Sequence, residues 1–285
     1  MLRTVLFSPA NDERKAGKAM SSGADAITLD LEDAVAYSQK GAARESLRSI
    51  LSQPPPVKLF IRVNSAASKY ILDDLEAVVG LPVDGLMLAK AESAGEVLKV
   101  DWLLGLIEEK KGLPTGKTNL IPFIESAGGI ISVCEIAACT PRIKALAFGG
   151  VDFSQELGLR YPSESDGLFF ARSQLVLASK KAGIDPPLDT VFPDIKNTAR
   201  LESEACIARK LGFQGKLVIH PAQVEPVNRA FTPTPEEIEY ARKVVAAFDQ
   251  AEKTGTAVIQ VDGKMVEYPI YRRSRSLLSK YGAGG

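Results

Sequence analysis

The sequence has one histidine and three cysteines among its 285 residues, which leaves few nitrogen and sulfur ligands for a metal. Zinc sites need clustered thiols or several imidazoles, so we do not expect zinc. His220 stands before a proline, where a structural hydrogen-bonding role is favoured. The cysteines (Cys134, Cys139 and Cys206) form no CxxC pair and no disulfide framework. We expect inert thiols and a cytoplasmic or similarly reducing compartment.

The sequence also has no net charge and no long apolar run. Its 35 basic residues balance 35 acidic ones, with a pI near 6.7. Such a balance creates no field that would gather nucleic acid or an anionic membrane. No segment approaches the roughly 18 apolar residues of a membrane helix, and the first residues read as a strand rather than a signal peptide. We therefore expect neither a nucleic-acid partner nor a membrane.

Short apolar segments recur along the chain and alternate with helical patterns. Continuous rather than alternating hydrophobicity is typical of parallel strands buried on both faces. The predicted strands are 4–8, 26–31, 57–63, 85–90, 119–125, 145–149, 189–192 and 217–220.

Eight strands alternating with helices predict a closed (β/α)8 TIM barrel over residues 1–230. An open doubly wound sheet is the competing architecture, but no GxGxxG follows an early strand. Residues 231–285 predict an extension of a helix to about Lys253, a hairpin turning at Asp262-Gly263, and a basic helix over 271–281. We expect this tail to lack a core of its own and to pack on its own barrel or be exchanged onto a neighbouring subunit.

Carboxylates follow several of the predicted strands, where active sites of barrel enzymes lie. Glu125 and Asp152 follow adjacent strands, beside glycines that let a ligand approach the backbone. Two carboxylates so close repel each other unless a cation lies between them, and Mg²⁺ typically takes one or two protein carboxylates. Helix caps or strand-end salt bridges are the alternative. The pattern favours a Mg²⁺ site.

Arg62 ends the third predicted strand and would face this metal. A permanently charged guanidinium suits a carboxylate or a developing enolate oxygen. We also expect an ion pair of Arg62 with Glu32 or Asp33, two acids placed around the metal ligands.

Several strings together resemble one family. They are VLFSPAND from Val5, LDLEDAV from Leu29, FIRVN from Phe60, PFIESA from Pro122, FGGVDF from Phe148 and GFQGKLVIHP from Gly212. Through them the chain resembles the citrate lyase β-subunit-like enzymes, which include malyl-CoA and citramalyl-CoA lyases, within the broader group of 4-hydroxy-2-oxoheptanedioate aldolases and citrate lyases. The resemblance covers nearly the whole chain and implies a (β/α)8 barrel.

The resemblance implies roles for particular residues. It assigns Mg²⁺ to Glu125 and Asp152 and substrate contact to Arg62. It also implies contacts with coenzyme A or substrate, and the matching positions are Phe7, Arg14, Lys18 and Asp194.

The resemblance further implies a catalytic acid in the tail, delivered to a neighbouring subunit. Glu267 stands where the family has Asp, and its extra methylene moves the carboxyl by about one bond length. A homo-oligomer is expected, a trimer or a multiple of one. A second departure is Ala89 before Lys90, where the family usually has proline.

The predicted activity is a reversible Claisen-type cleavage of a 3-hydroxyacyl-CoA to an acyl-CoA and a 2-oxo acid, with Mg²⁺ as cofactor. Malyl-CoA, citramalyl-CoA and citryl-CoA are the candidate substrates. Three alternatives stay open: citryl cleavage on an acyl carrier as in citrate lyase, a CoA-independent pyruvate aldolase, and a non-catalytic ligand-binding homologue. The long tail counts against the first, because carrier-dependent relatives tend to be shorter.

Overall fold

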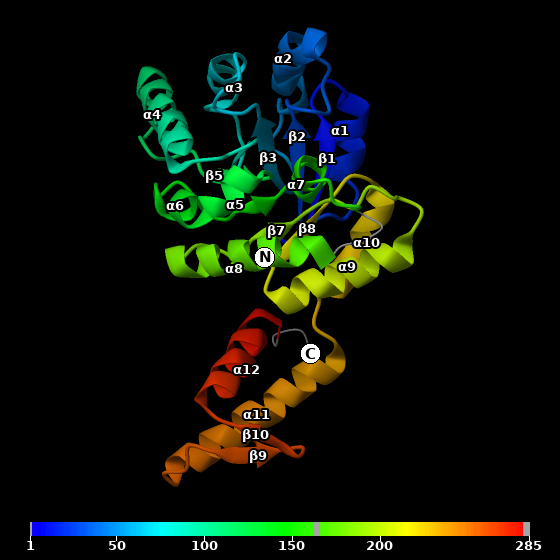
Figure 1. Ribbon diagram of the computed structural model, residues 1–285, viewed down its shortest axis with the longest axis vertical. Coiled ribbons are helices and arrows are strands. Elements are labelled where there is room, and N and C mark those ends of the chain that lie inside the picture. The colour runs from blue at the N-terminus through cyan, green and yellow to red at the C-terminus, as the bar shows by residue number, and fades with distance from the viewer. Residues whose placement is uncertain (1, 162–165, 282–285) are drawn as a thin grey trace. The chain divides into compact units, whose positions relative to one another are not determined.

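A computed structural model describes residues 2–161 and 166–281, which divide into two compact units, 1–231 and 232–285 (Figure 1). The strands of the first unit are β1 (Thr4–Pro9), β2 (Ala26–Asp30), β3 (Lys58–Val63), β4 (Gly85–Leu88), β5 (Leu120–Ile124), β6 (Ala147–Phe148), β7 (Leu188–Asp189) and β8 (Gly215–Val218). Its helices are α1 (Glu13–Met20), α2 (Lys40–Ile50), α3 (Ile71–Val78), α4 (Ala94–Lys110), α5 (Ala127–Ile131), α6 (Val133–Ala138), α7 (Gly150–Leu157), α8 (Phe169–Ala182), α9 (Thr198–Leu211) and α10 (Val224–Phe231), with 3-10 turns η1 (Tyr37–Gln39), η2 (Asp166–Leu168) and η3 (Pro221–Gln223).

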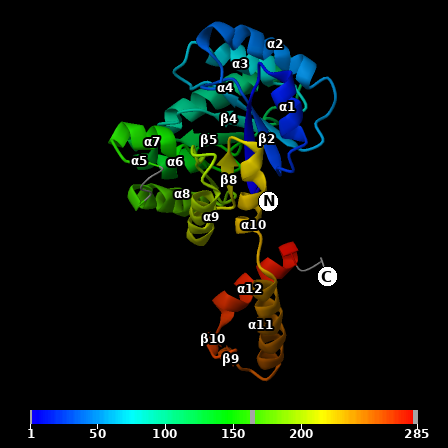
Figure 2. The same cartoon turned by 90° about the vertical axis from the view of Figure 1, so that its right-hand side faces the viewer.

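The eight strands pair in parallel and in chain order, and β8 closes on β1. This confirms the predicted (β/α)8 barrel and excludes the open doubly wound sheet. Helices lie outside the strands, as a second direction of view also shows (Figure 2). One apolar cluster fills the barrel interior, with Val5, Phe60, Met87 and Leu217 among its members, and a larger one packs between strands and helices. No helix among residues 2–161 and 166–281 is long and apolar enough to cross a membrane.

The last two barrel strands begin earlier than the sequence patterns predicted. The seventh is Leu188–Asp189 rather than 189–192, and the eighth is Gly215–Val218 rather than 217–220. A Cβ on Gly215 would lie 1.7 Å from the Leu2 carbonyl oxygen, so the strand needs glycine there. Lys216 is fully buried because it pairs with Asp189. Glycine and lysine weaken a strand pattern, and a long-range contact compensates for both.

The segment after β5 forms two short helices, α5 and α6, divided at Ser132. Ser126 caps the first of them, and its hydroxyl accepts a hydrogen bond from the Gly129 amide at 3.1 Å. A Cβ on Gly129 would lie 2.8 Å from the Ala91 carbonyl oxygen, so the short helix comes very close to the end of β4.

The second unit contains α11 (Pro235–Lys253), the hairpin β9 (Ile259–Val261) and β10 (Lys264–Val266), and α12 (Tyr268–Tyr281). Thr234 and Glu237 form a capping box at the start of α11. The expectation that this tail lacks its own core is wrong. Val244, Phe248 and Tyr271 belong to a buried cluster, in which the Phe248 and Tyr271 rings stack with centroids 4.6 Å apart. Aromatic side chains supply enough apolar area for this small core.

Candidate active site

A cavity of about 160 Å³ opens where the barrel strands end at their carboxyl termini. Such an opening is the place where barrel enzymes hold their substrates, because the loops that follow the strands meet there. The cavity is lined by Phe7, Asp30, Ala34, Arg62, Phe123, Glu125, Phe148, Gly149, Val151, Asp152, Thr190, Val191, Leu217 and Ile219.

Glu125 and Asp152 both line this cavity. Glu125 directly follows β5, and Asp152 lies in the first turn of α7. Gly149 makes their approach possible, since a Cβ there would lie 2.3 Å from both Cβ and Oε2 of Glu125. The Gly150 amide donates to the Thr190 hydroxyl at 2.8 Å and so anchors the start of α7 on the loop after β7.

The Glu125 carboxyl is buried in an environment that disfavours its charge. Burial and the Asp152 and Glu32 carboxylates raise the pKa of Glu125 to about 8, against the opposing effect of Arg62. A divalent cation would offset both the burial and the repulsion. No three His, Cys, Asp or Glu side chains of the described residues form a metal cage. Two carboxylates open to a cavity suit Mg²⁺, which keeps other positions for water and substrate oxygens.

Arg62 is held rigidly at the edge of the cavity. Its Nε and Nη2 donate to the two Asp30 oxygens at 2.7 and 2.5 Å, and its Nη1 lies 3.1 Å from Glu32. The rings of Phe7 and Phe123 lie on it, with centroids 5.1 and 5.7 Å from the guanidinium carbon. A guanidinium fixed in this way is preorganised for a substrate anion.

The sequence reading predicted only part of this pairing. Glu32 is a partner of Arg62, whereas Asp33 instead lies 3.4 Å from Lys90 Nζ. Asp30 was missed as the bidentate partner. The register of the barrel pairs Asp30 of β2 with Arg62 of β3. Strand register cannot be predicted from the sequence alone, so this contact was not expected.

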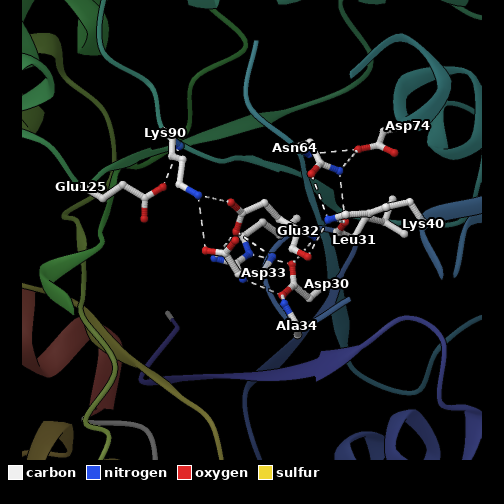
Figure 3. A network of polar contacts seen from close by, with 11 residues as sticks. Asp30, Leu31, Glu32, Asp33, Ala34, Lys40, Asn64, Asp74, Lys90 and Glu125 are labelled. Atoms are coloured by element: carbon white, nitrogen blue, oxygen red, sulfur yellow. Dashed lines mark hydrogen bonds and ion pairs between the residues drawn. The ribbon is translucent and has the colours of Figure 1, made fainter. Parts of the chain in front are cut away.

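Lys90 connects the two acidic groups of the site and was also missed (Figure 3). Its backbone amide donates to Glu125 Oε1 at 2.7 Å, and its Nζ donates to Glu32 Oε1 at 2.5 Å. The residue has a φ of 52°, an uncommon left-handed conformation for a side chain other than glycine. This conformation lets the amide and the ammonium reach different carboxylates.

A buried cation supports the loop that carries Glu32. Lys40 Nζ donates to the carbonyl oxygens of Leu31 and Glu32 at 2.6 and 2.7 Å and to Asn64 Oδ1 at 3.1 Å (Figure 3). Asn64 Nδ2 in turn donates to Asp74 at 2.6 Å. These bonds satisfy the carbonyl groups at the end of β2 and fix the direction in which Glu32 leaves it.

The remaining predicted residues lie elsewhere. Arg14 and Lys18 are exposed on α1 and are not among the cavity-lining residues. Asp194 accepts the Lys196 amide at 3.2 Å in an exposed turn before α9. His220 accepts the Ala222 amide and caps η3, in agreement with a structural role. Glu267 belongs to the second unit, where its carbonyl oxygen accepts the Tyr271 amide at the start of α12.

Residues 3–221 match the family described as HpcH/HpaI aldolase/citrate lyase. Citrate lyase subunit beta of Escherichia coli strain K12 is 35% identical over 99% of this chain and 94% of its own. A (3S)-malyl-CoA thioesterase of Cereibacter sphaeroides is 35% identical over 98% and 94%, and human mitochondrial citramalyl-CoA lyase 32% identical over 97% and 84%.

Among solved structures, CitE of Mycobacterium tuberculosis in complex with magnesium, acetoacetate and coenzyme A is 31% identical. Its TM-score is 0.82, with 98% of each chain covered. The match to the E. coli subunit includes the tail, so tail length does not separate this chain from citrate lyase, and that argument was wrong. The chain belongs to the HpcH/HpaI aldolase/citrate lyase family and is an enzyme of the lyase class.

Proposed function

We propose that this chain is a Mg²⁺-dependent carbon–carbon lyase that cleaves a 3-hydroxyacyl-CoA to an acyl-CoA and a 2-oxo acid. The observation that carries the proposal is the meeting of Glu125, Asp152 and Arg62 in one cavity at the carboxyl ends of the strands. The CitE relative that binds magnesium and coenzyme A together supports it.

In the proposed reaction, the bond between the hydroxyl-bearing carbon and the carbon next to the thioester breaks. Its electron pair passes to the thioester as an enolate, while the hydroxyl proton passes to water and the hydroxyl carbon becomes the carbonyl of the 2-oxo acid. Bound Mg²⁺, held by Glu125 and Asp152, supplies Lewis acidity toward substrate oxygens. Arg62 stabilises the enolate oxygen, because its contacts with Asp30 and Glu32 engage only three of the five N–H donors of a guanidinium.

The proton balance needs an acid for the enolate carbon, and Glu267 is the proposed donor, supplied by a neighbouring subunit of a homo-oligomer, a trimer or a multiple. Phe7, Arg14, Lys18 and Asp194 are the proposed contacts for coenzyme A or substrate. Arg14 and Lys18 lie one turn apart on α1, so both can reach the same phosphate groups.

The test is an assay of malyl-CoA, citramalyl-CoA and citryl-CoA with purified protein and Mg²⁺, in which the 2-oxo acid is followed. We expect turnover of at least one thioester, abolished by a chelator and restored by added Mg²⁺. Turnover that persists in the chelator, or no turnover of any of the three despite saturating Mg²⁺, would contradict the proposal.

A second candidate is cleavage of a citryl thioester on an acyl carrier subunit. It is favoured by the match to citrate lyase subunit beta of E. coli along nearly the whole chain. Cleavage of carrier-bound citryl with no cleavage of any CoA thioester would select this function instead.

We predict that Mg²⁺ affinity depends on pH through Glu125. The pKa of this carboxyl is raised to about 8, chiefly by burial, so a proton competes with the metal below that pH. The apparent Kd is expected to rise about tenfold for each pH unit below 8 and to level off above it. Calorimetric titration between pH 6 and 9 measures this. An affinity that is constant from pH 6 to 8 would show that Glu125 is ionised without the metal.

We predict that Glu267→Gln lowers kcat by about 100- to 10,000-fold, the usual contribution of a general acid. Glu267→Asp is expected to keep most of the activity, because it retains a carboxyl. Mg²⁺ affinity should be the same in both variants and in the wild type. If Glu267→Gln turns over at the wild-type rate, another group is the acid.

A further inference from the structure

Apolar side chains from the last two strands line the cavity together with its charged groups. In a closed barrel of eight strands, each strand faces the strand four places further on, so β3 lies opposite β7 and β4 opposite β8. The charged groups of the lining are Asp30, Arg62, Glu125 and Asp152, from the end of β2, from β3, from the end of β5 and from the start of α7, which bonds to Thr190 after β7. The ends of β7 and β8 contribute apolar side chains to the same cavity, namely Val191, Leu217 and Ile219.

Arg62 is the one cation among the described residues that line the cavity. It is already shared between Asp30 and Glu32 and lies on the side opposite β7. A substrate carboxylate placed against Val191, Leu217 and Ile219 would lose part of its hydration without gaining an ion pair, which is unfavourable. A hydrogen or methyl group in that place has no charge to desolvate, and a methyl group also gains apolar contact.

The three candidate substrates differ in the substituent on the hydroxyl-bearing carbon. Malyl-CoA carries hydrogen, citramalyl-CoA a methyl group and citryl-CoA a negatively charged carboxymethyl group.

We propose that the side formed by Val191, Leu217 and Ile219 selects a 3-hydroxyacyl-CoA whose substituent is small and uncharged, with methyl preferred, so that the 2-oxo acid product is pyruvate. This rests on the proposed lyase function. It assigns specificity to three residues that contribute neither to the metal site nor to proton transfer.

The wild-type protein tests the proposal by kcat/KM for the three thioesters at saturating Mg²⁺. We expect kcat/KM for citramalyl-CoA to be about 10-fold higher than for malyl-CoA, which is the usual discrimination for one methyl group in an apolar pocket. It should be about 100-fold higher than for citryl-CoA. Calorimetry with the Mg²⁺-loaded protein should likewise show pyruvate binding more tightly than oxaloacetate. Citryl-CoA cleaved as well as citramalyl-CoA, or oxaloacetate bound as tightly as pyruvate, overturns it.

Failure of the lyase proposal would look different. In that case none of the thioesters is cleaved, while the order of pyruvate and oxaloacetate binding still decides whether the apolar side selects the ligand.

Ile219→Arg provides a second test, because Ile219 is 38% exposed and its position has room for a longer side chain. A cation there should raise the ratio of kcat/KM for citryl-CoA to that for citramalyl-CoA at least about 10-fold. Ile219→Met, a neutral side chain that reaches into the same space, should leave the ratio within about threefold of wild type. A ratio that does not move in Ile219→Arg, in a variant that still binds Mg²⁺, counts against the proposal.

Discussion

Glu125→Gln is expected to lower kcat/KM for the cleaved thioester by at least about 1000-fold, which corresponds to roughly 4 kcal/mol of transition-state stabilisation. The amide keeps the size of the carboxyl and can still accept the Lys90 amide, which donates to Glu125 Oε1 at 2.7 Å. What it loses is the charge that would hold the cation with Asp152. Steady-state kinetics and calorimetric titration of Mg²⁺ measure the two effects.

The stability of the metal-free protein should change in the opposite direction. Because burial raises the pKa of Glu125 to about 8, ionising it costs folding free energy that accumulates from about pH 4.5 and is complete above pH 8. Glu125→Gln removes this cost, so we expect a higher Tm without metal at pH 8 and no increase when Mg²⁺ is added. In the wild type, Mg²⁺ should raise the Tm, because it binds only the folded state.

Glu92→Gln is the matched control. It makes the same chemical change at the end of a neighbouring strand, at an exposed residue that does not line the cavity. Activity and the Mg²⁺-induced rise in Tm should both stay close to wild type. A Glu125→Gln protein that still binds Mg²⁺ with wild-type affinity would exclude Glu125 as a ligand.

Asp189→Asn is expected to destabilise the barrel by about 3–5 kcal/mol, the typical cost of breaking a buried ion pair. Asp189 is completely buried and accepts from Arg172 Nε at 2.9 Å and from Lys216 Nζ at 2.6 Å. Arg172 Nη2 also donates to Glu204 at 3.0 Å. Without the Asp189 charge, two cations remain buried and Glu204, which pairs with Arg172, is the carboxylate left to offset them. Burial already lowers the pKa of Lys216.

Chemical denaturation of the full chain measures the loss of unfolding free energy. Far-UV circular dichroism and the fluorescence of the single tryptophan, Trp102 on α4 of the barrel unit, follow the unfolding. Glu225→Gln is the control, because the ion pair of Glu225 with Arg229 is exposed and should contribute little to stability. The double variant Asp189→Leu/Lys216→Met, which removes opposite charges together, should recover part of the loss. A loss below about 1 kcal/mol in Asp189→Asn would contradict this account.

This network also explains where sequence patterns were insufficient for the fold. The first six strands have continuous apolar runs, and their alternation with helices predicts the barrel. The seventh strand is Leu188–Asp189 and the eighth contains Lys216, and charged residues such as these weaken a strand pattern when only neighbours along the chain are considered. In the folded barrel they face each other in register and neutralise each other.

The residues of the proposed metal site could be predicted from the sequence, because their positions relative to the strands are local features. Glu125 directly follows one apolar run and Asp152 comes within a few residues of the end of the next, and in a parallel barrel all strand ends meet at one opening. Arg62 could be predicted in the same way, because it lies near the end of its strand. Lys90 and Lys40 were not predicted as parts of the site, because their roles depend on a left-handed backbone at one position and on burial at the other.

The sequence by itself determined the order of strands and helices, the barrel class and the carboxylates at the cavity, because each depends on periodicity or on the position of a residue within its own element. Only the tertiary structure decided which charges pair, that Asp30 rather than Asp33 holds Arg62, and that Val191, Leu217 and Ile219 line the cavity. It also showed that the tail has a core of its own around Phe248. These features arise between residues far apart in the chain, where strand register, burial and close backbone approach set the contacts.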